Sequence, residues 1–531
     1  MSEETIFARK ASGLVRELNW WDVLLFTLAG PAASGMTYYT VKVPGQYPGG
    51  NIVLAFFVGL LIYLFPIALL AIFSSSFPRS GSLYVVISRI THPILGFMPN
   101  WSYVIGGGAA LAVGFLNYLG LIPVASSFQL AGTLAHNQFY TTVGEALARS
   151  STRLWISIII TLIMWFLETR GLDKLKWVLR AIIYIPLALT AVAILSFFFA
   201  NGANSFSAVY GANAYENVRA LAASLDIKSA YLPPGKAMQG MLLSVIWAFT
   251  AAEAVSYVGS EVKSPRMAFM RGMLLGLLAV GALYVVNAYA VLHSFGSNFI
   301  TEYSWLYYNH SAELAKVLGT ATPPAPSIPF YASIILKNPI MSITLGIGYF
   351  LWYLNTSMII WMAGVRGIFA MSFDRLIPLK FAEIGRNGSP TWANHIVGIF
   401  ALLGTFVGLG DSLGLQLSES ILALLDFTTL FFIWPLGLAG MFFPFARPDL
   451  FEKSTFQYKI GKVPLISIIG GVTFFIGWWL ILYVGSYQDP LAQILNAVLL
   501  LAGLILMAVM WYRNRKEGID SNKIFSEIPP A

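Results

Sequence analysis

The feature of this 531-residue chain that most constrains its fold is a succession of apolar segments, each about 20 residues long. An α-helix rises about 1.5 Å per residue, so such a segment can cross the roughly 30 Å hydrocarbon core of a bilayer. Twelve segments of this kind centre near Gly30, Leu61, Ser102, Ile160, Leu187, Phe249, Leu283, Tyr353, Leu402, Phe431, Phe474 and Leu501. The sequence therefore predicts an all-α membrane protein with twelve transmembrane helices, which we number as predicted spans 1 to 12.

The composition agrees with a membrane protein and excludes several other classes. Hydrophobic residues make up 57% of the chain and charged residues only 11%, whereas soluble domains carry about 25% charged residues. The net charge of +8 comes from basic residues scattered between apolar segments, so we expect lipid contact and no nucleic-acid partner. The chain has no cysteine, which excludes disulfides, thiolate catalysis and cysteine metal sites.

The distribution of basic residues predicts the orientation in the membrane. An even number of spans places both termini on one side. Assigning the termini and the loops after predicted spans 2, 4, 6, 8 and 10 to the cytoplasm collects most of the 32 Lys and Arg residues there, as the positive-inside rule requires. We therefore expect a multi-pass protein of the plasma membrane with both termini cytoplasmic. The long loops at 201–236 and 297–336 then lie outside.

Predicted span 1 contains residues that interrupt a helix. The stretch "TLAGPAASGMTYYT" places Gly30 beside Pro31, and Ser34 beside Gly35, near the middle of the apolar segment. In lipid every backbone polar group needs a partner, so a break there is expected to serve a purpose. Its freed N–H groups can hold a carboxylate, and its freed carbonyls can hold a cation. The alternative is a proline kink whose free groups are paired by neighbouring Ser or Thr side chains.

Predicted span 6, "SVIWAFTAAEAVSYVGSEVKSP", carries Glu253 near its centre. An ionisable group at that depth costs about 2.5 to 3.5 kcal/mol on insertion scales, so it is expected to face the protein interior. Secondary transporters place a second broken helix at the matching position of an inverted repeat. Glu253 could pair backbone N–H groups at such a break, or it could carry a proton. No Gly or Pro lies at the centre of this span, so composition alone does not reveal a break.

Three stretches together resemble amino acid permeases of the amino acid, polyamine and organocation (APC) superfamily. Residues 77–106 are similar to the family's third span and the Pro-x-x-Gly-Gly-x-Tyr stretch before it. Residues 247–273 resemble its sixth span, with a Phe-x-Gly-x-Glu core and a Glu-x-Lys-x-Pro exit. Residues 363–393 resemble its eighth span and the following loop. The three stretches occur in the family's order.

This resemblance implies the leucine-transporter fold within a single domain, residues 1–531. Predicted spans 1 to 5 (20–200) and 6 to 10 (236–442) would form a 5+5 inverted repeat, with helices 1 and 6 broken at a central site. Predicted spans 11 and 12 (464–512) would lie at the periphery.

The resemblance also implies a set of substrate-binding residues. The backbone of Ala33, Ser34 and Gly35 would receive the substrate carboxylate, and the carbonyls near Ala248 to Ala251 would receive its amino group. The full set is Ala33, Ser34, Gly35, Met36, Tyr103, Trp247, Ala248, Phe249, Ala251 and Asn355. Ala33 and Ala251 stand where the family has Gly, so their Cβ atoms narrow the approach of a ligand to the backbone.

Four further residues are candidates for coupling transport to an ion, which would be a proton or sodium. Glu253 and Asp426 are the acids within spans. The resemblance implies a structural or vestibule role for Asp426, whereas an Asp426 that faces the site would favour a cationic side chain. Thr356 and Ser357 are candidate sodium ligands, although such hydroxyls commonly bond their own helix carbonyls. No cofactor is predicted.

These inferences predict a secondary active transporter or exchanger of amino acids or related amines, working by alternating access. A polyamine or organic cation transporter of the same fold is the alternative. A membrane-embedded enzyme would need a nucleophile and base or a metal cluster in the bundle, and the sequence shows no such set. A channel would need a ring of selectivity groups. The sequence leaves the oligomeric state open.

Overall fold

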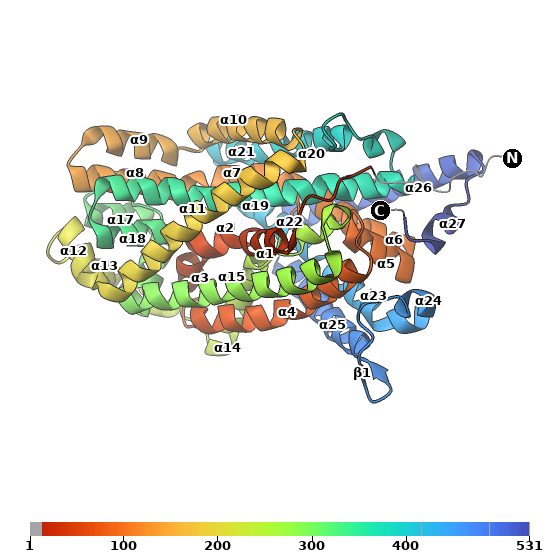
Figure 1. The fold of residues 1–531 in the computed structure, drawn as a ribbon. Coiled ribbons are helices and arrows are strands. Elements are labelled where there is room, and N and C mark those ends of the chain that lie inside the picture. Colours follow the sequence, from red (N-terminus) through yellow and green to blue (C-terminus); the bar gives the residue numbers. More distant parts are fainter. Residues whose placement is uncertain (1–12, 416, 488, 530–531) are drawn as a thin grey trace.

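The structure, a computed structural model, describes residues 13–415, 417–487 and 489–529. Within these ranges the chain is a bundle of helices with one small hairpin (Figure 1). Ten helical segments of the described chain are long and apolar enough to cross a membrane: Ile52–Ser76, Pro93–Ala135, Ser150–Glu168, Lys174–Phe199, Pro265–Phe295, Pro339–Phe373, Thr391–Ser412, Leu417–Ala446, Leu465–Ser486 and Pro490–Lys516. They coincide with predicted spans 2 to 5 and 7 to 12.

The elements of the first half of the chain are mostly α-helices. Their bounds are α1 (Trp20–Ala29), α2 (Ala32–Ser34), the π-helix η1 (Gly35–Tyr39), α3 (Thr40–Gln46), α4 (Ile52–Ser76), α5 (Ser82–Ile90), α6 (Pro93–Ile105), α7 (Ala110–Leu119), α8 (Leu121–Ala135), α9 (Gln138–Ala148), α10 (Ser150–Glu168), α11 (Leu172–Phe199), α12 (Gly202–Tyr210), α13 (Ala214–Ser224) and the 3-10 helix η2 (Ile227–Ala230).

The second half adds the hairpin and further helices. Their bounds are α14 (Pro234–Ala248), the 3-10 helices η3 (Ala254–Tyr257) and η4 (Gly259–Glu261), α15 (Pro265–Phe295), α16 (Ser297–Asn309), α17 (Ser311–Leu318), α18 (Ile328–Leu336), α19 (Pro339–Phe373), η5 (Leu379–Ala382), α20 (Thr391–Thr405), α21 (Val407–Ser412), α22 (Leu417–Leu430), α23 (Ile433–Ala446), α24 (Pro448–Phe451), the antiparallel pair β1 (Lys459–Ile460) and β2 (Val463–Pro464), α25 (Leu465–Tyr487), α26 (Pro490–Lys516) and α27 (Ser521–Ser526).

Predicted span 1 is divided into short helices. Helix α1 begins with a capping box, in which the Asn19 side chain accepts from the backbone N–H of Asp22 while the Asp22 carboxylate accepts from that of Asn19. It ends at Ala29, and Pro31 precedes the short helix α2. The π-helix η1 and helix α3 follow. The Gly-Pro pair therefore lies where the regular α-helix stops.

Predicted span 6 is also divided, although its centre contains no Gly or Pro. Helix α14 ends at Ala248, and the chain continues through turns and two short 3-10 helices, η3 and η4, before α15 begins at Pro265. Ala251 has a φ of 73°, in the left-handed region that residues with a Cβ rarely adopt. The second half of this span is therefore not α-helical.

A third interruption divides predicted span 3, which the sequence analysis treats as one helix. Helix α6 ends at Ile105 and α7 begins at Ala110, with three consecutive glycines between them. Gly107 packs so closely against α22 that an added Cβ would lie 2.1 Å from the carbonyl oxygen of Leu425. The break therefore brings the backbone of this span against its neighbour.

Helix α19 runs along the length of the bundle and packs against α6, α7, α8 and α11 (Figure 1). Helices α12, α13 and α17 lie at one end of the bundle and α27 lies at the other (Figure 1). At the α27 end, Leu18 pairs with Val262, and Arg79 Nε donates to the carbonyl of Pro529 at 2.6 Å. Both described ends of the chain are thus on the same side of the bundle. The termini themselves, residues 1–12 and 530–531, lie outside the described residues.

Candidate substrate site

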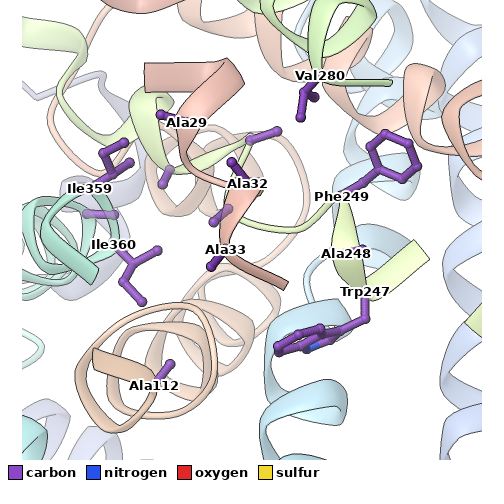
Figure 2. Packing of buried hydrophobic residues seen from close by; sticks show 14 of the residues in the cluster. Ala29, Ala32, Ala33, Ala112, Trp247, Ala248, Phe249, Val280, Ile359 and Ile360 are labelled. Atoms are coloured by element: carbon purple, nitrogen blue, oxygen red, sulfur yellow. The ribbon is translucent and has the colours of Figure 1, made fainter. Parts of the chain in front are cut away.

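The three interrupted spans meet at a narrow cavity, which we call the central cavity. Its volume of about 30 Å³ has room for a water molecule or two. Figure 2 shows Ala33, Ala112, Trp247 and Ile360 gathered in this region. The lining residues are Gly30, Pro31, Ala33, Ser34, Gly107, Gly108, Ala112, Phe115, Leu116, Trp247, Thr250, Ala251, Thr356, Ile360, Leu425 and Thr429.

Two glycines of predicted span 1 allow the interrupted spans to approach each other. An added Cβ on Gly30 would lie 2.4 Å from the carbonyl oxygen of Ala251. An added Cβ on Gly35 would lie 2.3 Å from the ring of Tyr284. Neither position has space for a methyl group, so the glycines are required for close packing as well as for a change of helix direction.

The hydroxyl of Tyr284, on α15, joins the two breaks. It lies 2.6 Å from the carbonyl oxygen of Pro31 and 2.9 Å from that of Ala248. The carbonyl of Ala248 is one of those expected to receive a substrate amino group, and it retains a second lone pair beside this bond. Sequence reasoning missed Tyr284, because no neighbouring motif distinguishes it from the other 24 tyrosines of the chain.

Glu253 stabilises the break in predicted span 6. Its carboxylate is fully buried and accepts hydrogen bonds from the hydroxyls of Tyr63 and Tyr103, both at 2.8 Å, and from the backbone N–H of Ala251 at 3.0 Å. The last bond pairs an N–H group that the end of α14 leaves free. This geometry matches the interpretation of Glu253 as an acid that pairs the backbone at a helix break.

The predicted substrate residues divide into two groups. Ala33, Ser34, Trp247 and Ala251 line the central cavity, whereas Gly35, Met36, Tyr103, Ala248, Phe249 and Asn355 do not. The Phe249 ring packs between Tyr63 and Tyr284, with centroids 6.2 and 5.1 Å away, and it lies apart from Trp247 in Figure 2. The amide nitrogen of Asn355 donates to the carbonyl of Ile182 on α11 at 2.6 Å.

The candidate ion ligands lie near the same region. Thr356 lines the central cavity, and its hydroxyl lies 3.3 Å from the carbonyl oxygen of Ala29 at the end of α1. The neighbouring Ser357 hydroxyl is buried and has no hydrogen-bond partner among the described residues. Asp426 on α22 is half-buried, and its Oδ1 likewise has no partner in the described chain. Within the same ranges, no three His, Asp or Glu side chains gather into a metal site.

Several lining residues were missed by sequence reasoning. They come from predicted spans 3 and 10 and are Gly107, Gly108, Ala112, Phe115, Leu116, Leu425 and Thr429. The three consecutive glycines in an apolar segment were an available signal for the first two. The others are ordinary apolar or small residues, and only the packing of the helices brings them to the cavity.

The central cavity is polar without being charged. None of the described residues that line it has an ionisable side chain. The hydroxyls of Ser34, Thr250, Thr356 and Thr429 contribute polar atoms, and the buried Trp247 Nε1 has no hydrogen-bond partner in the described chain. These groups could hold a small solute through hydroxyl groups, backbone groups and an indole ring, but a volume of about 30 Å³ requires the cavity to widen before such a solute enters.

A larger cavity, which we call the peripheral cavity, lies toward the α12–α13 end. Its volume is about 210 Å³, and Phe115 lines both cavities. Along α19, Tyr353 lines the peripheral cavity, Thr356 lines the central one, and Arg366 follows nearly three turns later. Arg366 forms a bidentate pair with Glu261, with bonds of 2.8 and 2.9 Å. The two cavities are thus followed, toward the α27 end, by a buried ion pair.

Comparison with known proteins identifies the family. The amino acid permease family model matches residues 18–510, which include all three interrupted spans. The chain belongs to this family. It is also similar to the methylthioribose transporter of Bacillus subtilis (strain 168), with 23% identity over 477 residues and 88% of each chain covered. The permease is therefore a multi-pass membrane protein, and both matches point to a transporter and not to an enzyme.

Proposed function

We propose that this permease is a secondary active transporter or exchanger that carries amino acids or related small solutes by alternating access around the central cavity. It would have twelve spans in the plasma membrane, with both termini cytoplasmic. Residues 20–200 and 236–442 would form the inverted repeats, and 464–512 the two peripheral spans. The ten long apolar segments, together with the two shorter divided ones at predicted spans 1 and 6, support this arrangement.

The observation that carries the proposal is the meeting of the interrupted helices at one cavity inside the bundle. Irregular backbone at membrane depth is tolerated where it is buried in protein or lines a cavity. Here Ala33 and Ser34 from one break and Thr250 and Ala251 from the other line the same space. Family membership gives this arrangement a transport role.

The chemistry of the central cavity narrows the substrate class. A polyamine carries two or more ammonium groups, and an unpaired buried ammonium costs several kcal/mol. The described lining offers no carboxylate to pair them. An amino acid with an uncharged side chain needs partners only for its own two charged groups, which backbone N–H and carbonyl groups at the breaks can supply. The uncharged lining therefore favours such an amino acid over a polyamine.

A neutral sugar is the second candidate. The relative in Bacillus subtilis is a methylthioribose transporter. The hydroxyls of Ser34, Thr250, Thr356 and Thr429 could bond the hydroxyls of such a solute, and Trp247 could stack on its apolar part. Because this solute carries no charge, it needs no ionic partner in the cavity.

The driving ion is proposed to be a proton or sodium. Thr356, whose hydroxyl lies 3.3 Å from the carbonyl oxygen of Ala29, and Ser357 are the candidate sodium ligands. Glu253 and Asp426 are the candidate proton carriers. The three hydrogen bonds that the Glu253 carboxylate accepts favour a structural role for that residue.

Uptake by the purified protein in proteoliposomes tests the proposal. Labelled leucine, methylthioribose and putrescine would each be offered under an inward proton gradient, under an inward sodium gradient, and in exchange with unlabelled solute. We expect saturable accumulation or exchange of leucine or methylthioribose and none of putrescine. Linear entry that no gradient drives uphill would indicate a channel. Failure of all three solutes under every gradient would contradict the proposal.

Variants in the cavity connect transport to this site. Ala33→Val adds two methyl groups to the narrow central cavity and is expected to lower uptake at least tenfold. The matched control is Ala223→Val on the exposed surface of α13, which should transport like the wild type. Equal loss in both variants, or no loss in Ala33→Val, would remove the central cavity as the transport site.

A further inference from the structure

The peripheral cavity contains charged groups of both signs, in contrast with the central cavity. Lys42 from α3 and Arg153 from α10 line it, together with Asp411 from α21 and Glu419 from α22. Tyr38, Tyr308 and Tyr353 form aromatic walls. These charged groups differ in whether they already have partners.

Among the described residues, Lys42 is a buried cation without an ion-pair partner. It is only 6% exposed, and no described carboxylate lies within 4.0 Å of its Nζ. Its ammonium group lies 5.5 Å from the Tyr38 ring centroid and 5.2 Å from that of Tyr308. Cation–π contacts at these distances recover only part of the cost of removing an ammonium group from water. The group can therefore accept an anionic partner.

The other charged groups of the peripheral cavity differ in how many of their polar atoms already have partners. The Asp411 carboxylate accepts hydrogen bonds from the Tyr118 hydroxyl and from the backbone N–H and hydroxyl of Ser418. Arg153 stacks on the Tyr118 ring at 4.4 Å, and its Nε is buried without a partner in the described chain. Glu419 is exposed at the cavity and forms no ion pair with a described residue. Free groups of both signs thus face one space.

We propose that the peripheral cavity is a second binding site, which takes an amino acid zwitterion with its carboxylate at Lys42 and its ammonium group toward Glu419. A solute with both charges satisfies both free groups at once, whereas a solute with one charge leaves the other group unpaired. The tyrosine walls suit an apolar or aromatic side chain. The cavity is also about seven times larger than the central one, so it can hold the solute before the central cavity opens.

This inference rests on the proposed function, because it names the substrate class of the same pathway and adds a place where that substrate is first bound. Phe115 lines both cavities and would separate the two sites. The inference also separates the two substrate candidates, since a neutral sugar offers nothing to Lys42 or to Glu419.

Binding of three matched probes to the purified full-length protein tests the inference. The probes are 4-fluoro-L-phenylalanine, which is a zwitterion, its amide, which is a cation, and 3-(4-fluorophenyl)propionate, which is an anion. Fluorine NMR line broadening, titrated to saturation, gives each affinity. We expect the zwitterion to bind at least tenfold more tightly than either single-charge probe. Equal affinities for the three probes, or no saturable binding of the zwitterion, would overturn the inference.

Two variants, each of which neutralises one charged residue, measure the contributions of Lys42 and Glu419 to zwitterion binding separately. Lys42→Met should weaken the zwitterion about tenfold and bring its affinity down to that of the cationic probe. Glu419→Gln should weaken the zwitterion in the same way and bring it down to the anionic probe. The matched controls are Lys316→Met and Glu313→Gln, which change exposed residues of α17 and should leave all affinities unchanged. Loss of the preference in the controls, or its retention in Lys42→Met, would overturn the inference.

Folding is checked independently. Lys42→Met replaces a buried charged side chain by an uncharged one of similar length. The unfolding temperature of this variant should therefore equal or exceed that of the wild type, while its zwitterion binding falls. Lys42→Arg keeps the charge and should keep the preference. Ala33→Val, in the central cavity, should lose uptake and retain zwitterion binding. Uptake without zwitterion binding would support the proposed function and contradict this inference. Zwitterion binding without uptake of any solute would contradict the proposed function.

Discussion

Of the interrupted spans that meet at the central cavity, predicted spans 1 and 6 are built differently. In predicted span 1 the residues that stop the helix, Gly30 and Pro31, are themselves at the break. In predicted span 6 the corresponding residues are alanines, and the break is supported from outside by Tyr63 on α4 and Tyr103 on α6, which bond Glu253. A broken helix can therefore be specified by its own sequence or by the buried contacts of its neighbours.

The largest effect is expected from removing the external support of span 6. Glu253→Ala leaves the two tyrosine hydroxyls and the N–H of Ala251 without their acceptor, which should lower the free energy of unfolding by roughly 3 to 5 kcal/mol. Thermal unfolding in detergent measures this change. The matched control, Glu313→Ala on the exposed face of α17, should change stability by less than about 0.5 kcal/mol. A small effect at Glu253 would show that span 6 breaks without this support.

The next effect is expected at the contact between the two breaks. In Gly30→Ala the new Cβ would lie 2.4 Å from the Ala251 carbonyl oxygen, so the two spans must move apart, at a cost of about 1 to 3 kcal/mol. Uptake should fall with stability, because the cavity lies at this contact. The control is Gly235→Ala on α14, where no atom lies within 4 Å of an added Cβ. Equal behaviour of the two variants would contradict the close approach.

A gain in stability is expected at Ala251. Its φ of 73° costs roughly 1 to 2 kcal/mol for a residue with a Cβ, and glycine removes most of that cost. Ala251→Gly should therefore raise the free energy of unfolding by about 1 kcal/mol, after the larger entropy loss of glycine is included. Ala223→Gly, in the regular helix α13, should have the opposite sign. A loss of stability in Ala251→Gly would indicate that the packing of the Ala251 methyl group contributes more free energy than the backbone strain costs.

The smallest effect is expected at Pro31. Helix α1 already ends at Ala29, the Thr356 hydroxyl contacts the Ala29 carbonyl, and the Tyr284 hydroxyl contacts the Pro31 carbonyl. These contacts persist in Pro31→Ala, so we expect a change of less than about 0.5 kcal/mol in the free energy of unfolding. The same thermal unfolding assay measures it. A loss as large as that of Gly30→Ala would show that the proline ring itself directs the break.

Much of the fold could be predicted from the sequence, because insertion into lipid demands long apolar segments that are visible one by one. The ten long apolar segments lie at ten of the twelve predicted spans. One of them, predicted span 3, is interrupted at three consecutive glycines, and its apolar pattern gives no sign of this break.

The site was predicted only in part. Ala33, Ser34, Trp247, Ala251 and Thr356 reach the central cavity, but Tyr103 turns to Glu253 and Phe249 packs between two tyrosines. The sequence did not predict Tyr284 or the cavity-lining residues of predicted spans 3 and 10. Which face of an apolar helix points inward depends on its neighbours, and a helix that is apolar all round gives no such signal.

The membrane-spanning character of the chain, the positions of its long apolar segments, its family resemblance and the weak point of span 1 can all be recognised in the sequence. These properties depend on local composition, because hydrocarbon selects apolar residues and Gly-Pro disfavours a continuous helix wherever it occurs. The end of the helix in span 6, the bonds of Glu253 to two distant tyrosines, and the contrast between an uncharged cavity and one lined by charges without ion-pair partners among the described residues emerge only in the folded protein. Those properties depend on contacts between residues far apart in the chain, which no local pattern encodes.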